Sequence, residues 1–315
     1  MKAIVQDTYG EADVLKFADV DRPEPGPGEL LVEVRAAGVD PGTWHIMTGL
    51  PLIARPALGW GKPRKRVRGL ELAGRVAAVG PDVTGFAPGD EIFGTAWGAF
   101  AEHVTMRADH ATRKPANLTF EQAAAVPISA CTALQALRKK DDARRVLVIG
   151  AGGGVGTYAV QLAQARGAHV TGVCSTAKAD LVRELGAEVI DYTSQEITGT
   201  YDLILDIAGN RKLGTLRRHL TADGTLVLVG GEDGGRWLGG LQRSLGALLL
   251  SPFLKQNLRG LLATEPVADL DHLRELVEAG KVTPVLDRTF PLAGAADAIR
   301  YLRAGKARGK VVVVV

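Results

Sequence analysis

Hydrophobic positions in the first 125 residues follow the short alternating runs that are typical of β-strands. Two such runs are ELLVEVRAAGV (29–39) and LELAGRVAAVG (70–80), and loops rich in glycine and proline, such as RPEPGPGE (22–29), separate the runs. Glycine and proline interrupt regular elements and favour turns. The pattern therefore predicts a β-rich domain over residues 1–125.

From residue 126 onward, continuous apolar runs alternate with amphipathic segments. The runs are VLVIG (146–150), AHVTGVC (168–174), YDLILDI (201–207) and GTLVLVG (224–230). Short apolar runs with helical patterns between them are typical of buried parallel strands with crossover helices. The end of the chain, KVVVVV (310–315), is again strand-like. We expect a doubly wound α/β domain over residues 126–259, inserted before a return to the first domain over 260–315.

Composition narrows the classes of protein and of partner. The 315 residues are 46% hydrophobic and 23% charged, as in soluble globular proteins, and a formal net charge of +3 is too small to favour nucleic acid or membrane. Two cysteines, Cys131 and Cys174, exclude a disulfide framework and a multi-cysteine zinc site. The chain starts with a strand-like pattern, and LGALLLSPFL (245–254) is too short to span a bilayer. We therefore expect a cytoplasmic protein without nucleic-acid or membrane partners.

The strongest motif is a glycine-rich turn between a predicted strand and a predicted helix, in VLVIGAGGGVGTYAVQLA (146–163). Its glycines include Gly150, Gly153, Gly154 and Gly156, of which Gly150, Gly153 and Gly156 fit a G-x-x-G-x-x-G spacing. Glycines let the backbone approach a pyrophosphate, and the first turn of the helix offers free N–H groups and the positive end of its dipole. In this context the motif indicates dinucleotide binding rather than a simple tight turn.

The end of the next predicted strand distinguishes NADP(H) from NAD(H). An NAD site usually carries an acidic residue there, whereas this chain has Ser175, followed closely by Lys178. A hydroxyl and an ammonium group suit a 2′-phosphate, so we expect NADP(H). The alternative is that Ser175 caps the following helix and Lys178 is simply solvated.

Several longer segments, taken together, resemble the medium-chain dehydrogenase/reductase superfamily and its zinc-independent quinone oxidoreductase (ζ-crystallin-like) branch. They are GVDPGTWHIMTG, RGLELAGRVAAVG, GDEIFG, GAFAEHV, AAAVPISACTALQAL, VLVIGAGGGVG, STAKADLVRELGAEVIDY, LVEAGKVTPVLDRTFPL and ARGKVVV. The resemblance covers nearly the whole chain. It implies a GroES-like catalytic domain around a Rossmann domain, a homodimer, and NADPH-linked reduction of quinones or activated double bonds.

The resemblance also implies a set of cofactor contacts. Thr132 would meet the nicotinamide amide, and Gly153 to Gly156, Val155 included, would hold the pyrophosphate. Ser175, Lys178 and Tyr192 would meet the 2′-phosphate. The adenosine and ribose sides would be lined by Asp206, Ile207, Ala208, Gly230 and Gly231.

No zinc site is expected. Where zinc-dependent members of the superfamily have cysteine, histidine and cysteine ligands, this chain has Asp40, Leu70 and Ile128. Leucine and isoleucine cannot bind a metal, and catalytic zinc needs three protein ligands.

GVDPGTWH (38–45) is the candidate catalytic segment. Asp40 and Pro41 suit a helix N-terminus, and the resemblance places Asp40 near the nicotinamide ribose. His45, whose ordinary pKa lies near neutrality, is a candidate proton donor, and Trp44 a candidate wall for a flat substrate. The alternatives are a helix cap for Asp40, an exposed helix position for His45 and core packing for Trp44.

Without a Lewis acid, hydride donation to an electron-poor carbon stays feasible, so we expect reduction of a quinone or an α,β-unsaturated carbonyl. The alternatives are a non-catalytic NADPH-binding sensor or partner protein, and a zinc-free alcohol dehydrogenase. The basic segment KPRKRVR (62–68) is open to two interpretations. It is either a solvated loop or, by resemblance, a border of the cleft that attracts an anionic substrate tail.

Overall fold

The computed structural model describes residues 1–231 and 234–315, which form two compact units. Unit 1 contains Met1–Cys131, Thr264–Gly280 and Pro284–Val315, and unit 2 contains Thr132–Ala263 and Lys281–Thr283. The first chain crossing between the units falls within α4 (Pro127–Leu137). The limits expected from the sequence were 125/126 and 259/260.

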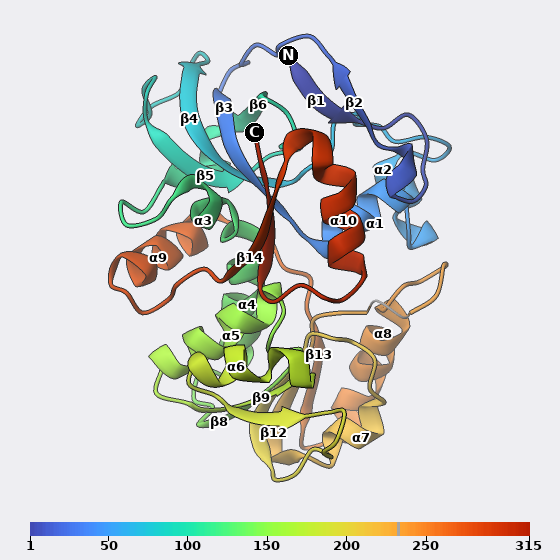
Figure 1. The fold of residues 1–315 in the computed structure, drawn as a ribbon. Helices are drawn as coiled ribbons and strands as arrows, with labels where there is room; N and C mark the ends of the chain where they lie inside the picture. Colours follow the sequence, from blue (N-terminus) through green and yellow to red (C-terminus); the bar gives the residue numbers. More distant parts are fainter. Residues whose placement is uncertain (232–233) are drawn as a thin grey trace. The chain divides into compact units, whose positions relative to one another are not determined.

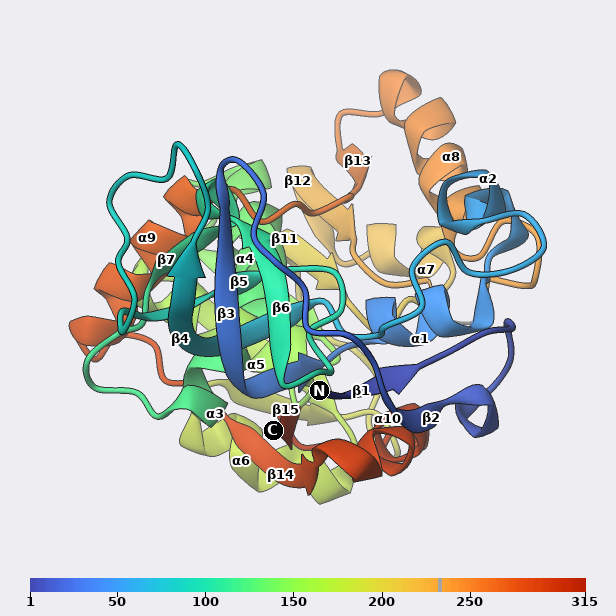
Figure 2. The same cartoon turned by 90° about the horizontal axis from the view of Figure 1, so that it is seen from above.

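Unit 1 is built mainly on antiparallel strands, as the alternating pattern predicts. One sheet pairs β1 (Lys2–Val5) with β2 (Lys16–Asp19). The larger sheet has the order β14-β15-β3-β4-β5-β7, with β6 paired to β3 (Figure 2). Its strands are β3 (Glu29–Val39), β4 (Glu71–Val79), β5 (Glu91–Thr95), β6 (His103–Arg107), β7 (Ala111–Arg113), β14 (Leu286–Pro291) and β15 (Lys310–Val314). Because β15 pairs with β3, the end of the chain completes the sheet that its start begins.

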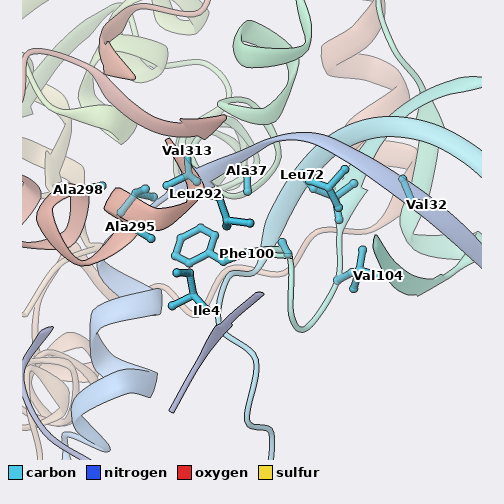
Figure 3. Packing of buried hydrophobic residues seen from close by; sticks show 14 of the residues in the cluster. Ile4, Val32, Ala37, Leu72, Phe100, Val104, Leu292, Ala295, Ala298 and Val313 are labelled. Atoms are coloured by element: carbon cyan, nitrogen blue, oxygen red, sulfur yellow. The ribbon is translucent and has the colours of Figure 1, made fainter. Parts of the chain in front are cut away.

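Besides the first part of α4, the helices of unit 1 are α1 (Pro41–Thr48), α2 (Arg55–Leu58), α3 (Phe120–Ala124), α9 (Val267–Glu278) and α10 (Ala295–Arg303). Of these helices, α3, α9 and α10 pack against this sheet. Phe100 lies in a cluster of buried side chains that includes Ile4 of β1, Leu72 of β4 and Ala295 of α10 (Figure 3). Burial of this apolar cluster is the main stabilising term of unit 1.

Unit 2 is a parallel sheet in the order β10-β9-β8-β11-β12-β13 (Figure 1). Its strands are β8 (Arg145–Ile149), β9 (His169–Cys174), β10 (Glu188–Asp191), β11 (Tyr201–Asp206), β12 (Leu220–Leu228) and β13 (Asn257–Gly260). Its helices are α5 (Gly154–Ala165), α6 (Ala179–Glu184), α7 (Leu213–Arg217) and α8 (Leu241–Leu250). The predicted doubly wound parallel sheet is confirmed.

The strand order places a switch point between β8 and β11. The chain leaves β8 toward β9 and β10 on one side, and returns to β11, β12 and β13 on the other. In open parallel sheets, ligands bind beyond the carboxyl ends of the strands at such a point. The glycine-rich turn follows β8 directly, so it lies at this position.

Short 3₁₀ helices connect several elements. They are η1 (Ala12–Val14), η2 (Leu52–Ala54), η3 (Ala108–His110), η4 (Arg138–Lys140), η5 (Thr176–Lys178), η6 (Ser251–Phe253) and η7 (Leu292–Gly294). None of the helices in residues 1–231 and 234–315 has both the length and the apolar character needed to cross a membrane.

Candidate functional site

The glycine turn of unit 2 is built so that larger residues would not fit at two of its positions. Gly150 has a φ of +90°, a conformation that favours glycine. A Cβ on Gly156 would lie 2.1 Å from the carbonyl oxygen of Gly150, so the first turn of α5 packs directly on the end of β8. These two glycines are therefore required by the fold itself.

Gly153 has a different environment, which suits a phosphate. It is the N-cap of α5 and provides no side-chain hydrogen bond to the first turn of the helix. A Cβ there would meet only the Gly150 carbonyl oxygen, at 3.4 Å, within 4 Å. The N–H groups of the first turn, which includes Gly154 and Val155, have no partner within the helix itself, and the helix dipole favours an anion there. The turn therefore fits the pyrophosphate of a dinucleotide.

The residues expected to meet a 2′-phosphate come together beside this turn. Ser175 follows β9, Tyr192 follows β10, and the backbone N–H of Tyr192 donates to the carbonyl of Cys174 at 3.1 Å. Lys178 lies against the turn, since a Cβ added to Gly152 would lie 2.8 Å from the Cβ of Lys178. A hydroxyl, a half-exposed phenol ring and an ammonium group thus border the strand ends where the ribose of a dinucleotide lies.

An acidic residue that the sequence analysis did not consider lies next to these groups. Asp191 ends β10, and its carboxylate accepts hydrogen bonds from the hydroxyls of Thr176 at 2.5 Å and Thr193 at 2.7 Å. The hydrogen bond from Thr176 is the main reason that the pKa of Asp191 is lowered, so the group is charged at neutral pH. Its oxygens are engaged within the loop.

The other predicted cofactor residues of unit 2 lie at the ends of β11 and β12, next to the glycine turn. The N–H groups of Ile207 and Ala208 donate to the carbonyl of Ile149, at 3.1 and 3.3 Å. A Cβ on Gly230 would lie 1.9 Å from the Ile207 carbonyl oxygen. A Cβ on Gly231 would meet the backbone of Gly240. Thr132 lies on α4, where it is buried.

Asp206 is fully buried and forms an ion pair with a residue that the sequence analysis missed. Arg243 of α8 donates to its carboxylate at 2.6 Å and to the carbonyl of Gly209 at 2.5 Å. The N–H of Gly209 donates to the same carboxylate at 3.1 Å. A sequence signal was present, because Arg243 is the one charged residue of α8. Its side chain therefore links α8 to the turn after β11.

In unit 1, Asp40 acts as a helix cap. Its carboxylate accepts hydrogen bonds from the backbone N–H and the hydroxyl of Thr43, both at 3.1 Å, and Asp40 is 2% exposed. Pro41 occupies the first turn of α1. The cap that the sequence suggests is thus present, and it positions α1.

Trp44 and His45 extend from α1 into different contacts. The indole N–H of Trp44 donates to Glu11 at 3.1 Å, and the guanidinium of Arg303 lies 3.9 Å from the ring centre. Trp44 therefore belongs to the core between α1 and α10. His45 is half-buried, and its Nδ1 lies 3.0 Å from the carbonyl of Leu50. Because a carbonyl oxygen only accepts, Nδ1 is the nitrogen that carries the proton in this contact.

A buried ion pair lies where the superfamily's zinc ligands would be expected. The ammonium of Lys310 on β15 lies 2.5 Å from the carboxylate of Glu71 and donates to the hydroxyl of Ser129 at 3.1 Å. The backbone N–H of Ile128 donates to the second oxygen of Glu71 at 2.9 Å. Both charged side chains are at most 2% exposed.

The surroundings of this pair shift the pKa of Glu71 in opposite directions. Burial raises the pKa of Glu71, and the nearby Asp40 adds to the rise, whereas the Lys310 ammonium favours the charged carboxylate. Glu265, which precedes α9, has its pKa raised to about 7, mainly by burial and further by Glu71 and Asp40. Three carboxyl groups therefore share one region of unit 1 with the cation Lys310.

These side chains do not fit a zinc ion. Lys310 already occupies the carboxylate of Glu71 with a positive charge, and Leu70 and Ile128 offer no ligand atoms in their side chains. Among residues 1–231 and 234–315, no group of three or more His, Cys, Asp or Glu side chains is arranged to hold a metal. The positive charge that pairs with the Glu71 carboxylate is thus the ammonium group of Lys310.

Comparison with known families matches both parts of the chain. The family described as "Alcohol dehydrogenase GroES-like domain" matches residues 26–116, and the family described as "Zinc-binding dehydrogenase" matches residues 185–313. The first match agrees with the GroES-like domain expected from the sequence.

Individual relatives cover nearly the whole chain. The mouse protein "NAD(P)H oxidoreductase RTN4IP1, mitochondrial" is 36% identical, over 99% of this chain and 89% of its own length. The spinach protein "Quinone-oxidoreductase homolog, chloroplastic" is 31% identical, over 99% of this chain and 98% of its own. The structure of Escherichia coli quinone oxidoreductase complexed with NADPH has a TM-score of 0.83 and 26% identity, and covers all of both chains.

These relatives correct one expectation. The sequence analysis predicts a cytoplasmic location, which is wrong, because the mouse and spinach relatives are named as mitochondrial and chloroplastic proteins. The lack of a visible signal peptide does not by itself determine the compartment in which a protein works.

Proposed function

Because the chain belongs to the quinone oxidoreductase branch of the medium-chain dehydrogenase/reductase superfamily, and is an NAD(P)H-dependent oxidoreductase, we propose that it reduces a quinone or an α,β-unsaturated carbonyl with NADPH. The observation that carries the proposal is the glycine turn with Lys178 packed beside it. When bound, the dinucleotide supplies the hydride, and the chain supplies orientation and a dry environment.

The preference for NADPH over NADH rests on charge at the ends of β9 and β10. Lys178 adds a positive charge beside the turn, and Ser175 takes the place of the acid that binds the ribose in NAD sites. Asp191 is the one feature here that favours NADH, and its oxygens already accept hydrogen bonds from Thr176 and Thr193. We expect the positive charge of Lys178 to decide the selectivity.

The proposed chemistry uses no metal. Lys310 balances the charge of Glu71, and an electron-poor substrate needs less stabilisation than an alkoxide would, because its own carbonyl oxygen takes up the arriving charge. His45 is the proposed proton donor, through Nε2, with Leu50 holding the ring by Nδ1. Asp40 orients this segment as the cap of α1, and Trp44 supports it from the core.

The decisive experiment follows the loss of NADPH absorbance with an o-quinone and with a medium-chain enone, and NADH is run in parallel. We expect NADPH-selective turnover that dialysis against EDTA leaves unchanged. Tight NADPH binding without turnover on either acceptor would instead indicate a non-catalytic binding protein. Oxidation of a simple alcohol in the reverse direction would indicate a zinc-free alcohol dehydrogenase.

Two variants test the residues in named roles. Lys178→Ala is expected to raise KM for NADPH by about tenfold while KM for NADH changes little, because one charge contact to the 2′-phosphate is lost. His45→Gln is expected to lower kcat with NADPH affinity intact, because the proposed proton donor is lost. The proposed homodimer is tested separately, by light scattering during size-exclusion chromatography.

A further inference from the structure

Helix α8 of unit 2 exposes the apolar stripe that an amphipathic helix normally buries (Figure 1). Four of its leucines follow the i, i+4, i+7, i+8 spacing that places side chains on one face of a helix. All four are exposed, and they are Leu241, Leu245, Leu248 and Leu249. A helix on the surface of a globular domain usually turns such a stripe toward the core, so α8 has the reverse orientation.

The opposite face of α8 is held against the interior of unit 2. Ala247 is fully buried, and Arg243 donates to the carboxylate of Asp206 at 2.6 Å. Ser244 lies close to β13, since a Cβ added to Gly260 would lie 2.6 Å from the Ser244 hydroxyl oxygen. These contacts fix the rotation of the helix about its axis. The leucine stripe therefore cannot turn inward unless the buried Asp206 loses its cation, which is strongly unfavourable.

Two aromatic side chains extend the leucine stripe beyond the ends of α8. Trp237 lies in the turn that precedes the helix and is 75% exposed. Phe253 lies in η6, which follows the helix, and is 86% exposed. With the four leucines, these two residues form the α8 surface. Exposed groups of large apolar side chains mark sites that bind a protein or a membrane, so we expect the α8 surface to have a partner.

The charged residues of the segment that carries the α8 surface are all basic. Between Gly234 and Thr264 the chain has four basic residues and no acidic one. Arg243 is paired with Asp206, whereas Arg236, Lys255 and Arg259 are exposed and form no ion pair within the part of the chain that the structure describes. The net charge of the whole chain, on which the expectation of no membrane partner rests, does not describe this segment.

The distribution of charge favours a lipid surface over a second copy of this chain. In a symmetric pair of copies the α8 surface would face itself. The exposed cations of one copy would then lie near the same cations of the other, with no carboxylate from this segment to pair with them, and like charges across an interface are unfavourable. A bilayer that contains anionic lipids offers an apolar layer for the leucines and negative headgroups for the cations.

We propose that the α8 surface binds the protein to an anionic lipid bilayer, with α8 lying in the plane of the headgroups. The apolar face of such an interfacial helix enters the bilayer by about 5–10 Å and does not span it, which agrees with the 10 residues of α8. Trp237 suits the level of the headgroups, where tryptophan is enriched in membrane proteins. Arg236 and Lys255 would contact the headgroups themselves.

The first test measures binding of the full chain to vesicles by flotation. Vesicles of phosphatidylcholine with phosphatidylglycerol are used with the wild type, Leu248→Ser/Leu249→Ser and Phe17→Ser. Phe17 is an exposed apolar residue of β2 and is the matched control. We expect the double variant to lower the partition coefficient by about tenfold or more, because two leucines no longer enter the bilayer, and Phe17→Ser to leave it unchanged. Absence of binding by the wild type, or equal binding by all three proteins, overturns the proposal.

A pair of charge variants tests the contribution of the cations. Arg236→Gln/Lys255→Gln should weaken binding to the mixed vesicles by about tenfold and leave binding to pure phosphatidylcholine unchanged. Lys62→Gln/Lys65→Gln removes the same charge from exposed positions of the basic segment in unit 1 and should have little effect. Equal weakening by both variants would mean that the vesicles respond to the total charge of the protein, and the assignment to α8 would fail.

Tryptophan fluorescence then locates the contact. Trp60 of unit 1 is as exposed as Trp237, so the two rings form a matched pair. With vesicles whose acyl chains carry bromine, a quencher of indole fluorescence, we expect quenching in the wild type and in Trp60→Phe, and much less quenching in Trp237→Phe. If Trp60→Phe loses the quenching instead, the membrane contact lies in unit 1 and the proposal is wrong.

Light scattering during size-exclusion chromatography tests the second copy as the alternative occupant. A mass of Leu248→Ser/Leu249→Ser that is lower than that of the wild type would show that the α8 surface joins two copies, and would overturn the proposal. An unchanged mass together with weakened vesicle binding supports a lipid surface as the partner.

Discussion

At the scale of single residues, the pair of Lys310 and Glu71 is the most consequential feature of unit 1. Replacing Lys310 by Met leaves a fully buried carboxylate without its cation, so we expect a loss of about 3–5 kcal/mol in the free energy of unfolding. Urea denaturation followed by circular dichroism measures this. Lys2→Met, which breaks the exposed pair with Asp19, is the matched control and should change the stability little, because solvent screens both charges.

A double variant separates the ion pair from simple packing. Glu71→Gln combined with Lys310→Met removes both charges, so it should recover much of the stability that Lys310→Met loses. If the single and double variants are equally destabilised, the loss comes from the methylene chain of Lys310 in the core, and the electrostatic interpretation fails.

The sequence could exclude zinc ligands at positions 70 and 128, because leucine and isoleucine have no donor atoms. It could not show what balances Glu71, since Lys310 lies 239 positions away. The same holds for Asp206 and Arg243, which are 37 positions apart. Periodicity reports local structure, whereas pairing of buried charges depends on contacts that only the folded chain makes.

At the scale of elements, the glycine turn shows which glycines serve the fold and which serve a ligand. Gly156→Ala puts a methyl group 2.1 Å from the carbonyl of Gly150, so we expect a clear drop in Tm and loss of NADPH binding together. Gly153→Ala is the control, because its φ of −98° suits any residue and its Cβ would have space. It should keep the Tm of the free protein.

NADPH affinity then separates the two roles further. Because Gly153 faces the position proposed for the pyrophosphate, Gly153→Ala should weaken NADPH binding, measured by fluorescence titration, without destabilising the protein. Full NADPH affinity in this variant would place the phosphates elsewhere. The strand–turn–helix arrangement itself was predictable, since its strand, glycines and helix are adjacent in the chain. The placement of Trp44 against α10 was not, because α10 begins 251 positions later.

At the scale of the whole molecule, the apolar pattern predicted the doubly wound sheet and the β-rich unit, because burial of apolar surface determines both. The pattern did not predict where charge would be buried. Arg68, Glu71 and Lys310 are interior charged residues in a chain of ordinary composition. The net charge of +3 therefore gives no information on which charged residues are buried.

Glu265 gives the dependence of stability on pH a definite direction. Its carboxyl ionises near 4.5 in the unfolded chain and at about 7 in the folded protein. Between these values the folded state holds a proton that the unfolded state has lost, so stability falls as the pH rises from about 4.5 to about 7 and then levels off. Complete burial would make this loss about 3 kcal/mol, and the partial exposure of Glu265 makes it smaller.

Glu265→Gln removes that contribution, because the amide stays neutral at every pH. We expect its Tm to match the wild type near pH 4 and to exceed it increasingly up to about pH 7, with a constant difference above. Comparing the two proteins cancels the opposite effect of carboxyls with lowered pKa, such as Asp191. Glu184→Gln makes the same change at an exposed position and should show no such divergence. A difference that is independent of pH would mean that the pKa of Glu265 is the same in the folded and unfolded states, and would contradict the prediction.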